Sequence, residues 1–476
     1  MNLKLSNKFY FILANLIVFL LVFLNRHNGF FWDTIQLASG HGNFYYYNNF
    51  SHLLLPDGLD SGHIPAFGMY IALIWKIFGR SIEVSHLAML PFAFGIIWQI
   101  NILCKRFIAE KHVGIALLLV FLDASLMSQI TLVSPDVPLM FFFLLALNSI
   151  LKNNRLLITV SVFLLFLTSM RGMMLSVCLV SIDVYTNFGY KNLLKTEQIK
   201  VLLKRSLLYL PAFIIFILFN SYHYYEKGWI GYHKDSPWAA CFEKVDFKGF
   251  IFNIGLLGWR IIDFGRIAVW IVFAYILLKY KSQILKDKKN HILFFTFVVV
   301  LFVLPLNMLW AKGLLMHRYL IPIYILISLL TATLLFSDYV TSKLRNIIIV
   351  FWLIVSLSGN FWIYPPKVSK GWDATLGHLP YYKLRWEAIH YLEAEKIDLK
   401  DVDTFFPNYY VLDDIDLNND KRSFDPYIIG NNSEYLLYSN IYNISDEEYD
   451  YIMKNYTAVK EFRNIGVFIT ILKKKT

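Results

Sequence analysis

Residues 9–24 read FYFILANLIVFLLVFL, an uninterrupted apolar stretch that follows the basic residues Lys4 and Lys8. A segment of this kind near the start of a chain is either a cleaved signal peptide or a retained membrane helix. The residues that come next, 25–28 (NRHN), do not form a small-residue cleavage site. The stretch therefore predicts a first membrane-spanning helix, with its basic end in the cytoplasm.

The composition of the whole chain also indicates a membrane protein. Of its 476 residues, 57% are hydrophobic and only 17% are charged, whereas soluble domains carry about 25% charged residues. The net charge of +11 is divided among short loops, which favours an effect of membrane orientation over binding of nucleic acid. The three cysteines, Cys104, Cys178 and Cys241, show no metal-ligand spacing and no disulfide framework.

Further apolar stretches predict a polytopic, mainly α-helical membrane protein with about eleven transmembrane helices, although several are shorter than the roughly 20 residues of a straight span. Lys and Arg gather in alternate loops, as the positive-inside rule requires if the amino terminus is cytoplasmic. The stretches after the first cover residues 84–104, 113–133, 137–151, 156–170, 173–187, 206–222, 266–280, 291–310, 318–336 and 346–363.

This orientation places residues 26–83 and everything after residue 364 on the outer face. Residues 64–79 (IPAFGMYIALIWKIFG) are expected to form an amphipathic helix that lies on the outer surface, because a span there would reverse the side of every later loop. After Pro365-Pro366 the sequence becomes rich in Asp, Glu, Lys, Asn and Tyr. We therefore predict a transmembrane domain over residues 1–365 and a small, soluble, extracytoplasmic α/β domain over residues 366–476.

Two carboxylates lie at the outer mouths of predicted spans: Asp33, within FFWDT, and Asp136, within SPDVP. An unpaired carboxylate there is costly unless water, a cation or a reaction uses it. Each also has a structural interpretation, since Asp33 and Thr34 could cap a helix of the first loop and Asp136 could be the N-cap before Pro138. A third carboxylate, Asp123, falls inside the predicted span 113–133 and is expected to pair with a neighbouring helix or to be protonated.

Basic residues occupy short outer turns at the same face. Arg171 and Arg318 are candidate ligands for a phosphate, because a guanidinium can hold two phosphate oxygens at once. His317 and Lys312 could add to the same pocket. The alternative is that these side chains reach toward lipid head groups, which for Lys312 is the favoured interpretation.

The order of these short motifs resembles the GT-C superfamily of membrane glycosyltransferases, above all the protein O-mannosyltransferases and the lipid A aminoarabinose transferases. The motifs are Asp33 in the first outer loop, LDSGHIP at residues 59–65, SPDVPL at 134–139, Arg171-Gly172, and HRYLIP at 317–322. Two departures stand out, because the family often has Asp-Glu where this chain has Asp33-Thr34, and His-Pro-Pro where it has residues 63–65 (HIP). The first departure makes a metal at Asp33 less expected.

The resemblance implies a sugar donor linked to polyprenyl phosphate, with Asp33 as the catalytic residue. Breaking the anomeric bond requires a base for the acceptor hydroxyl and a cationic cradle for the leaving phosphate. We expect Asp33 to be that base, and Asp136 to orient the acceptor or support the site. Asp60 and His63 are possible supports of the donor site, with a loop hydrogen bond or a cap as the alternative.

The sequence therefore predicts a glycosyltransferase, inverting in mechanism, that moves a hexose or pentose to an acceptor hydroxyl on the outer face of a bacterial inner membrane. The acceptor could be a protein, a glycan or a lipid, and membrane lipids surround the protein. No cofactor is firmly predicted, and a divalent metal is possible but unsupported. A transporter or flippase of a lipid-linked sugar is the alternative, for which inverted repeats and charges deep in several spans would be expected. A sensor without catalytic activity is a further alternative.

Overall fold

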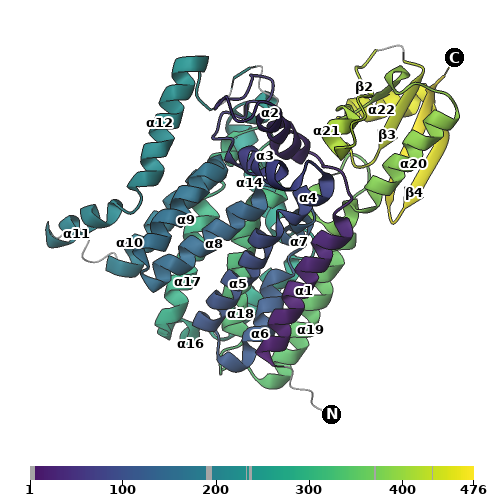
Figure 1. Cartoon of the computed structure of the whole chain (residues 1–476). Coiled ribbons are helices and arrows are strands. Elements are labelled where there is room, and N and C mark those ends of the chain that lie inside the picture. Colours follow the sequence, from purple (N-terminus) through teal and green to yellow (C-terminus); the bar gives the residue numbers. More distant parts are fainter. Residues whose placement is uncertain are drawn as a thin grey trace.

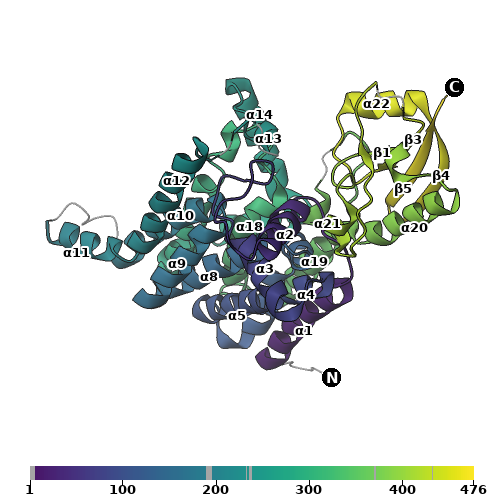
Figure 2. The ribbon, with the colours of Figure 1, turned by 45° about the horizontal axis from the view of Figure 1, so that its top comes forward.

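The protein is a helical bundle with a small mixed domain at one end (Figures 1 and 2). The computed structural model describes residues 6–188, 196–231, 233–234, 238–368, 371–430 and 433–475. The helices of the bundle are α1 (Asn7–Asn25), α2 (His41–Tyr47), α3 (Ala66–Phe78), α4 (Ile82–Leu87), α5 (Leu90–Phe107), α6 (Val113–Phe121), α7 (Ala124–Ile130), α8 (Asp136–Lys152), α9 (Arg155–Thr168), α10 (Met170–Phe188), α11 (Thr196–Ser206), α12 (Leu210–Lys227), α13 (Ala239–Phe242), α14 (Phe247–Ile262), α15 (Ile267–Lys279), α16 (Lys281–Lys286), α17 (Lys288–Val303), α18 (Ile321–Leu335) and α19 (Ser342–Ser358).

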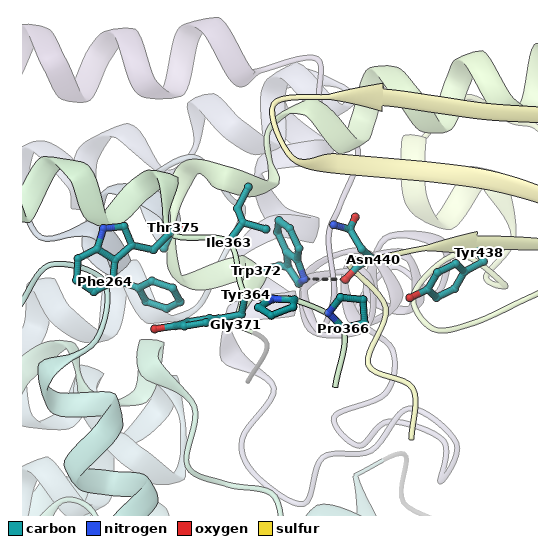
Figure 3. A pocket seen from close by; sticks show the side chains of 11 residues that line it. Phe264, Ile363, Tyr364, Pro366, Gly371, Trp372, Thr375, Tyr438 and Asn440 are labelled. Atoms are coloured by element: carbon teal, nitrogen blue, oxygen red, sulfur yellow. Dashed lines mark hydrogen bonds between the residues drawn. The ribbon is translucent and has the colours of Figure 1, made fainter. Parts of the chain in front are cut away.

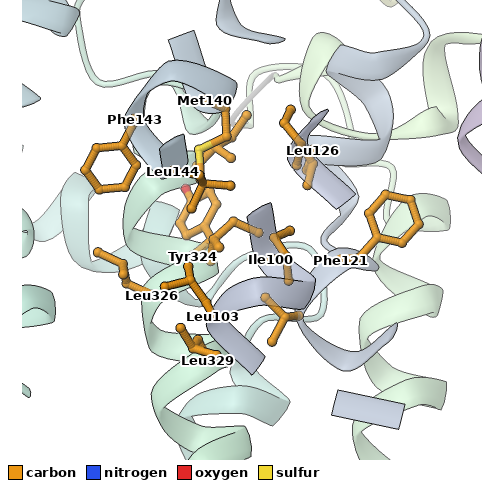
Figure 4. Packing of buried hydrophobic residues seen from close by; sticks show 14 of the residues in the cluster. Ile100, Leu103, Phe121, Leu126, Met140, Phe143, Leu144, Tyr324, Leu326 and Leu329 are labelled. Carbon is orange, nitrogen blue, oxygen red and sulfur yellow. The ribbon is translucent and has the colours of Figure 1, made fainter. Parts of the chain in front are cut away.

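The centre of the bundle is α18. Every residue of this helix is buried, as expected of a helix that is apolar all round and enclosed by other helices. Figure 4 shows its residues Tyr324, Leu326 and Leu329 packed among side chains from α5, α6, α7 and α8. Helices farther out, such as α1 and α19, bury only one side and expose large apolar residues on the other. Exposed apolar surface on this scale is suited to contact with lipid.

Within the described residues, five helical segments are long and apolar enough to cross a membrane, and up to eight if each bent pair counts as one span. The five are Asn7–Asn25, Ile82–Phe107, Lys289–Trp310, His317–Leu335 and Ser342–Phe361. The protein is therefore an integral membrane protein, while the expected number of about eleven spans stays a prediction.

Two predicted segments differ from the structure. The stretch 113–133 is not one helix, because α6 and α7 meet at an angle of 74°. Asp123 is the N-cap of α7, where its carboxylate accepts hydrogen bonds from two backbone amides. Residues 223–265, between the predicted spans 206–222 and 266–280, contain a 16-residue helix, α14, which joins α15 at 89°. At each break an aspartate, Asp123 or Asp263, stands where the backbone hydrogen bonding of the helix is interrupted.

The first outer loop covers one end of the bundle, at the end opposite the amino terminus (Figure 1). It contains a six-residue π-helix, Ile35–Gly40, followed by α2 and then α3. The predicted helix in residues 64–79 is present as α3, and it packs on α2 and α4. Gly42 and Gly68 allow the close approach of these helices, since a Cβ at Gly68 would lie 2.3 Å from the Cβ of His41.

The C-terminal domain lies at the same end as this loop. Its sheet has the order β2-β1-β3-β5-β4, with β1 parallel to β2 and β3 and with antiparallel pairs β3/β5 and β4/β5. Helix α20 packs on β5 and β4. The predicted α/β character is therefore confirmed. The elements are α20 (Pro380–Ala394), β1 (Val402–Thr404), α21 (Leu412–Asp416), β2 (Asp425–Pro426), β3 (Tyr435–Ser439), α22 (Asp446–Asn455), β4 (Tyr456–Asn464) and β5 (Val467–Lys474).

The C-terminal domain is joined to the bundle by a shared apolar core and a buried ion pair. Phe31 and Leu132 from the bundle belong to the same buried cluster as Tyr381 and Ile389 of the domain. Arg80, which follows α3, donates two hydrogen bonds of 3.1 Å to the carboxylate of Asp413 in α21. These contacts fix the domain over the outer loop.

We expect Arg80→Ala to lower the free energy of unfolding by about 3 kcal/mol, because it leaves the buried Asp413 carboxylate with the exposed Lys421 and the backbone amide of Asn419 as partners. Thermal unfolding in detergent measures this. Burial alone would raise the pKa of Asp413, but hydrogen bonds from Arg80 and Lys421 outweigh it and hold the pKa below its ordinary value. The pair therefore stabilises the fold above about pH 4 and loses its contribution as the pH falls further. Lys421→Ala is the matched control, with an expected loss below about 1 kcal/mol.

Candidate active site

The centre of the candidate site is the guanidinium of Arg318, which contacts three carboxylates. It donates hydrogen bonds to Asp33 and Asp373, and its Nε lies 3.6 Å from an oxygen of Asp136. Asp136 in turn accepts a hydrogen bond from Arg171. The Arg318 and Asp136 side chains are almost completely buried. We call these five residues the ion-pair cluster; three carboxylates against two guanidiniums give it a formal charge of −1.

Asp33 is held by the residues before and after it. Phe31 is fully buried in the core shared with the C-terminal domain, where it stacks on His378 at 5.1 Å between ring centroids. Trp32 adopts φ = 54°, an uncommon backbone conformation for a bulky residue. The π-helix begins two residues after Asp33, and such helices are frequent at functional sites. The Asp33 side chain keeps 16% of its surface exposed, so a substrate can reach it.

Asp136 and Arg171 come from the first turns of α8 and α10. Pro135, not Asp136, is at the N-cap of α8, and the Asp136 carboxylate is directed to Arg171. The guanidinium of Arg171 also lies 3.9 Å from the ring centroid of Tyr319. The Asp136 side chain therefore does not act as a helix cap. The Asp33 side chain does not cap a helix either, because its carboxylate binds Arg318.

Asp373 is a member of the cluster that the sequence analysis missed. It lies in the short 3-10 turn Trp372–Ala374, which connects the bundle to the C-terminal domain. Ser128 and Gln129 of α7 hold this turn by donating hydrogen bonds of 2.8 Å to the carbonyl of Asp373. Burial raises the pKa of Asp373, and the charges of Asp33 and Asp136 raise it further against the opposing effect of Arg318. The C-terminal segment thus contributes a carboxylate that protonates more readily than usual.

We expect Asp373→Asn to bind the polyprenyl phosphate that the resemblance implies about ten-fold more tightly, because the substitution raises the cluster charge from −1 to 0. In the unsubstituted protein, affinity should fall as the pH rises through the raised pKa of Asp373 and this carboxyl ionises. The variant should lack that pH step. Native mass spectrometry across a pH series measures both effects. Asp450→Asn is the control, since this exposed carboxylate of the same domain pairs only with Lys367 in the part of the chain that is described. Equal affinities for Asp373→Asn and the unsubstituted protein would contradict the role of cluster charge.

The structure does not bring the other four predicted residues into the cluster. His317 is 2.8 Å from Asp263 in a separate buried network that also includes Tyr364. Lys312 is exposed and bridges to Glu243 at 3.1 Å. Asp60 accepts hydrogen bonds from the Gly62 amide and from His223, as the loop interpretation expects.

His63 is close enough to the cluster for the charge of Arg171 to act on it. Its pKa is lowered by burial, and the charge of Arg171 contributes to the lowering. It is therefore neutral near pH 7 and hydrogen-bonds to Ser61 and to the backbone of Ile64. Its predicted contact with the donor stays a prediction, as do the roles of the cluster residues.

The mid-span carboxylate has the structural role that was expected. Asp123 accepts hydrogen bonds from Arg266, with the shorter at 2.7 Å, and both side chains are buried. Arg266 also donates to Ser125 at 2.6 Å and lies over the ring of Tyr324. The prediction of a pair with a neighbouring helix is confirmed.

A cleft is lined in part by the turn that carries Asp373. Phe264, Tyr364, Trp372, Tyr438 and Asn440 are among the residues that line it, and the Trp372 indole donates a hydrogen bond to the Asn440 carbonyl (Figure 3). Trp372 and Asp373 are consecutive, so one short turn contributes both to the cleft and to the ion-pair cluster. Among the described residues, no group of three or more His, Cys, Asp or Glu side chains is arranged to hold a metal ion.

The comparisons with known proteins place the fold. No protein-family model matches the chain, and no curated protein sequence matches it either. Among solved structures, the chain is similar to ArnT from Cupriavidus metallidurans, whose crystal structure was determined bound to undecaprenyl phosphate. The similarity covers 97% of both chains with a TM-score of 0.53 and 10% sequence identity. The chain therefore shares the fold of ArnT, and the predicted mainly α-helical membrane fold with a small C-terminal α/β domain is confirmed.

Proposed function

We propose that this protein transfers a sugar from a polyprenyl-phosphate donor to an acceptor hydroxyl on the outer face of the membrane. The observation that carries the proposal is the direct contact of Asp33 with Arg318, with Arg171 reached through Asp136. A base and two guanidiniums in one place are what transfer from a lipid-linked phosphate requires. The shared fold supports the proposal, because ArnT was crystallised with undecaprenyl phosphate bound.

The reaction needs one proton transfer. The acceptor oxygen forms a bond to the anomeric carbon of the sugar, and the bond from that carbon to the phosphate oxygen breaks with its electron pair on the phosphate. Asp33 accepts the proton of the acceptor hydroxyl. The leaving group is polyprenyl phosphate, whose added charge the guanidiniums stabilise. A single in-line attack of this kind inverts the anomeric configuration.

Arg318 must exchange partners when the donor binds. Its guanidinium is engaged by three carboxylates, so a phosphate has to replace at least one of them. Asp373 is suited to leave, since it protonates more readily than an ordinary carboxylate and comes from the connecting turn rather than from a helix of the bundle. We therefore assign Arg318 and Arg171 to the donor phosphate and Asp33 to the acceptor.

The experiment compares the envelope of cells with and without this protein. Mass spectrometry of glycans, glycoproteins and lipids should reveal one class of sugar-modified product that requires the protein, while the corresponding lipid-linked sugar accumulates in its absence. Movement of labelled lipid-linked sugar across the membrane without any new glycosidic bond would support a flippase instead. If cells without the protein lose no product and accumulate no lipid-linked sugar, the proposal is overturned.

A further inference from the structure

Four aromatic side chains form a continuous group beside Asp33. They are Trp32 from the first outer loop and Phe406, Tyr409 and Tyr410 from the C-terminal domain, and we call them the aromatic patch. The ring centroids of Trp32 and Phe406 are 5.4 Å apart, those of Phe406 and Tyr410 are 6.1 Å apart, and Tyr409 stacks on Tyr410 at 5.2 Å. Each of the four residues is partly exposed. The patch therefore keeps accessible aromatic surface, while Trp32 and Tyr410 also pack against buried clusters.

The patch is next to the predicted base. Trp32 immediately precedes Asp33, and the Tyr410 hydroxyl donates a 3.5 Å hydrogen bond to Gln36, in the π-helix that follows Asp33. The pKa of Tyr410 is raised by burial, by Tyr409 and then by the charge of Asp33. A molecule lying on these rings would thus have an edge close to the Asp33 carboxylate.

One polar group of the patch has no partner. The indole Nε1 of Trp32 is shielded from solvent and makes no hydrogen bond within the described part of the chain. A buried N–H without an acceptor is costly. The left-handed backbone of Trp32 adds strain at the same residue, and strain of this kind gathers at binding and active sites. The unpartnered donor and the strained backbone together indicate that Trp32 belongs to a binding or active site.

We infer that the aromatic patch binds a sugar ring of the acceptor, so that the acceptor is a carbohydrate with a hydroxyl directed at Asp33. This inference rests on the proposed function and specifies its acceptor class. A pyranose offers an apolar face of C–H groups to an aromatic ring and hydroxyls at its edge. The patch matches both features, with ring faces for stacking and with the tyrosine hydroxyls for hydrogen bonds.

The charge around the patch favours a neutral sugar. The charged groups that act on Tyr410 are the carboxylates of Asp33 and Asp414. Asp414 is largely buried and accepts a 3.1 Å hydrogen bond from Asn43. An acceptor bearing phosphate groups, such as a lipid A head group, would meet like charges there. A serine or threonine side chain of a protein would provide no ring to cover the aromatic faces.

The experiment uses the full-length protein in lipid nanodiscs on an array of neutral oligosaccharides, lipid A and serine- and threonine-containing peptides. We expect binding to neutral oligosaccharides, lowered about ten-fold by Tyr409→Ala and by Phe406→Leu, because each loses one ring contact. Tyr409→Phe keeps the ring and should retain most of the binding. Tyr451→Ala, which removes a partly buried tyrosine from α22, is the control and should bind as the unsubstituted protein does. Unchanged binding of undecaprenyl phosphate shows that each variant is folded.

The outcomes separate this inference from the proposed function. Sugar transfer to a peptide or to lipid A, with no binding of neutral oligosaccharides, would overturn the inference and leave the glycosyltransferase in place. Equal binding by Tyr409→Ala and the unsubstituted protein would also overturn it. Absence of any transfer, to any acceptor, would overturn the proposed function and the inference with it.

Discussion

Asp33→Asn is expected to lower sugar transfer by roughly 100- to 10,000-fold, the usual contribution of a general base. Asparagine has nearly the shape of aspartate but cannot accept the proton of the acceptor hydroxyl. Binding of undecaprenyl phosphate should persist, because the guanidiniums of Arg318 and Arg171 remain. The measurement is transfer of radiolabelled sugar in membranes, together with native mass spectrometry of the lipid-bound protein.

The matched control for Asp33 is Asp57→Asn in the same outer loop. Asp57 is 59% exposed and pairs with Lys227, so its substitution should leave transfer within about two-fold of the unsubstituted protein. If the Asp33→Asn variant has full activity, Asp33 is not the base. Asp373, the carboxylate of the cluster whose pKa is raised, then becomes the next candidate.

Arg318→Ala is expected to reduce both stability and donor binding. The substitution leaves Asp33, Asp136 and Asp373 close together, and loss of one partner from a buried ion pair costs about 3–5 kcal/mol. Affinity for undecaprenyl phosphate should fall by about 100-fold, since two charge-assisted hydrogen bonds to phosphate are lost. Thermal unfolding and lipid binding are measured on the same detergent-solubilised sample.

Arg318→Lys separates these two effects. Lysine keeps the positive charge among the carboxylates but lacks the planar fork of the guanidinium. It should restore most of the stability and only part of the phosphate affinity. Lys312→Ala is the control, because Lys312 is exposed and pairs with Glu243. If Arg318→Lys binds undecaprenyl phosphate as tightly as the unsubstituted protein, bidentate recognition by Arg318 is wrong.

The membrane fold was predictable because apolar stretches and basic loops alternate along the sequence. α18 lies within the stretch 318–336, and α5 lies close to the stretch 84–104. The breaks were not predictable, since Asp123 interrupts an apolar run with no glycine or proline next to it. Its partner Arg266 is distant in the sequence, and only the folded structure shows that the two neutralise each other.

The candidate site was only partly predictable, because a site of this kind combines residues from helix ends with residues from connecting loops. Asp373 belongs to no motif, and its role depends on a turn that α7 holds against Arg318. The burial of Phe31 in the core of the C-terminal domain likewise requires the tertiary structure. These long-range contacts carry no local signal.

Neighbouring residues of one motif also differ in ways that the sequence does not reveal. His317 and Arg318 are consecutive in the short 3-10 turn His317–Leu320, where successive side chains point in different directions. His317 therefore contacts Asp263 while Arg318 contacts Asp33. The motif identified the right turn, but it did not reveal that the two side chains enter different pockets.

The most direct test of the central claim is an experimental structure of the protein with undecaprenyl phosphate bound. We expect the phosphate to contact the guanidinium of Arg318 and to lie within reach of Arg171, with Asp373 displaced from Arg318 and Asp33 still beside the site. A phosphate bound elsewhere in the bundle, with the contact between Arg318 and Asp373 intact, would contradict the account.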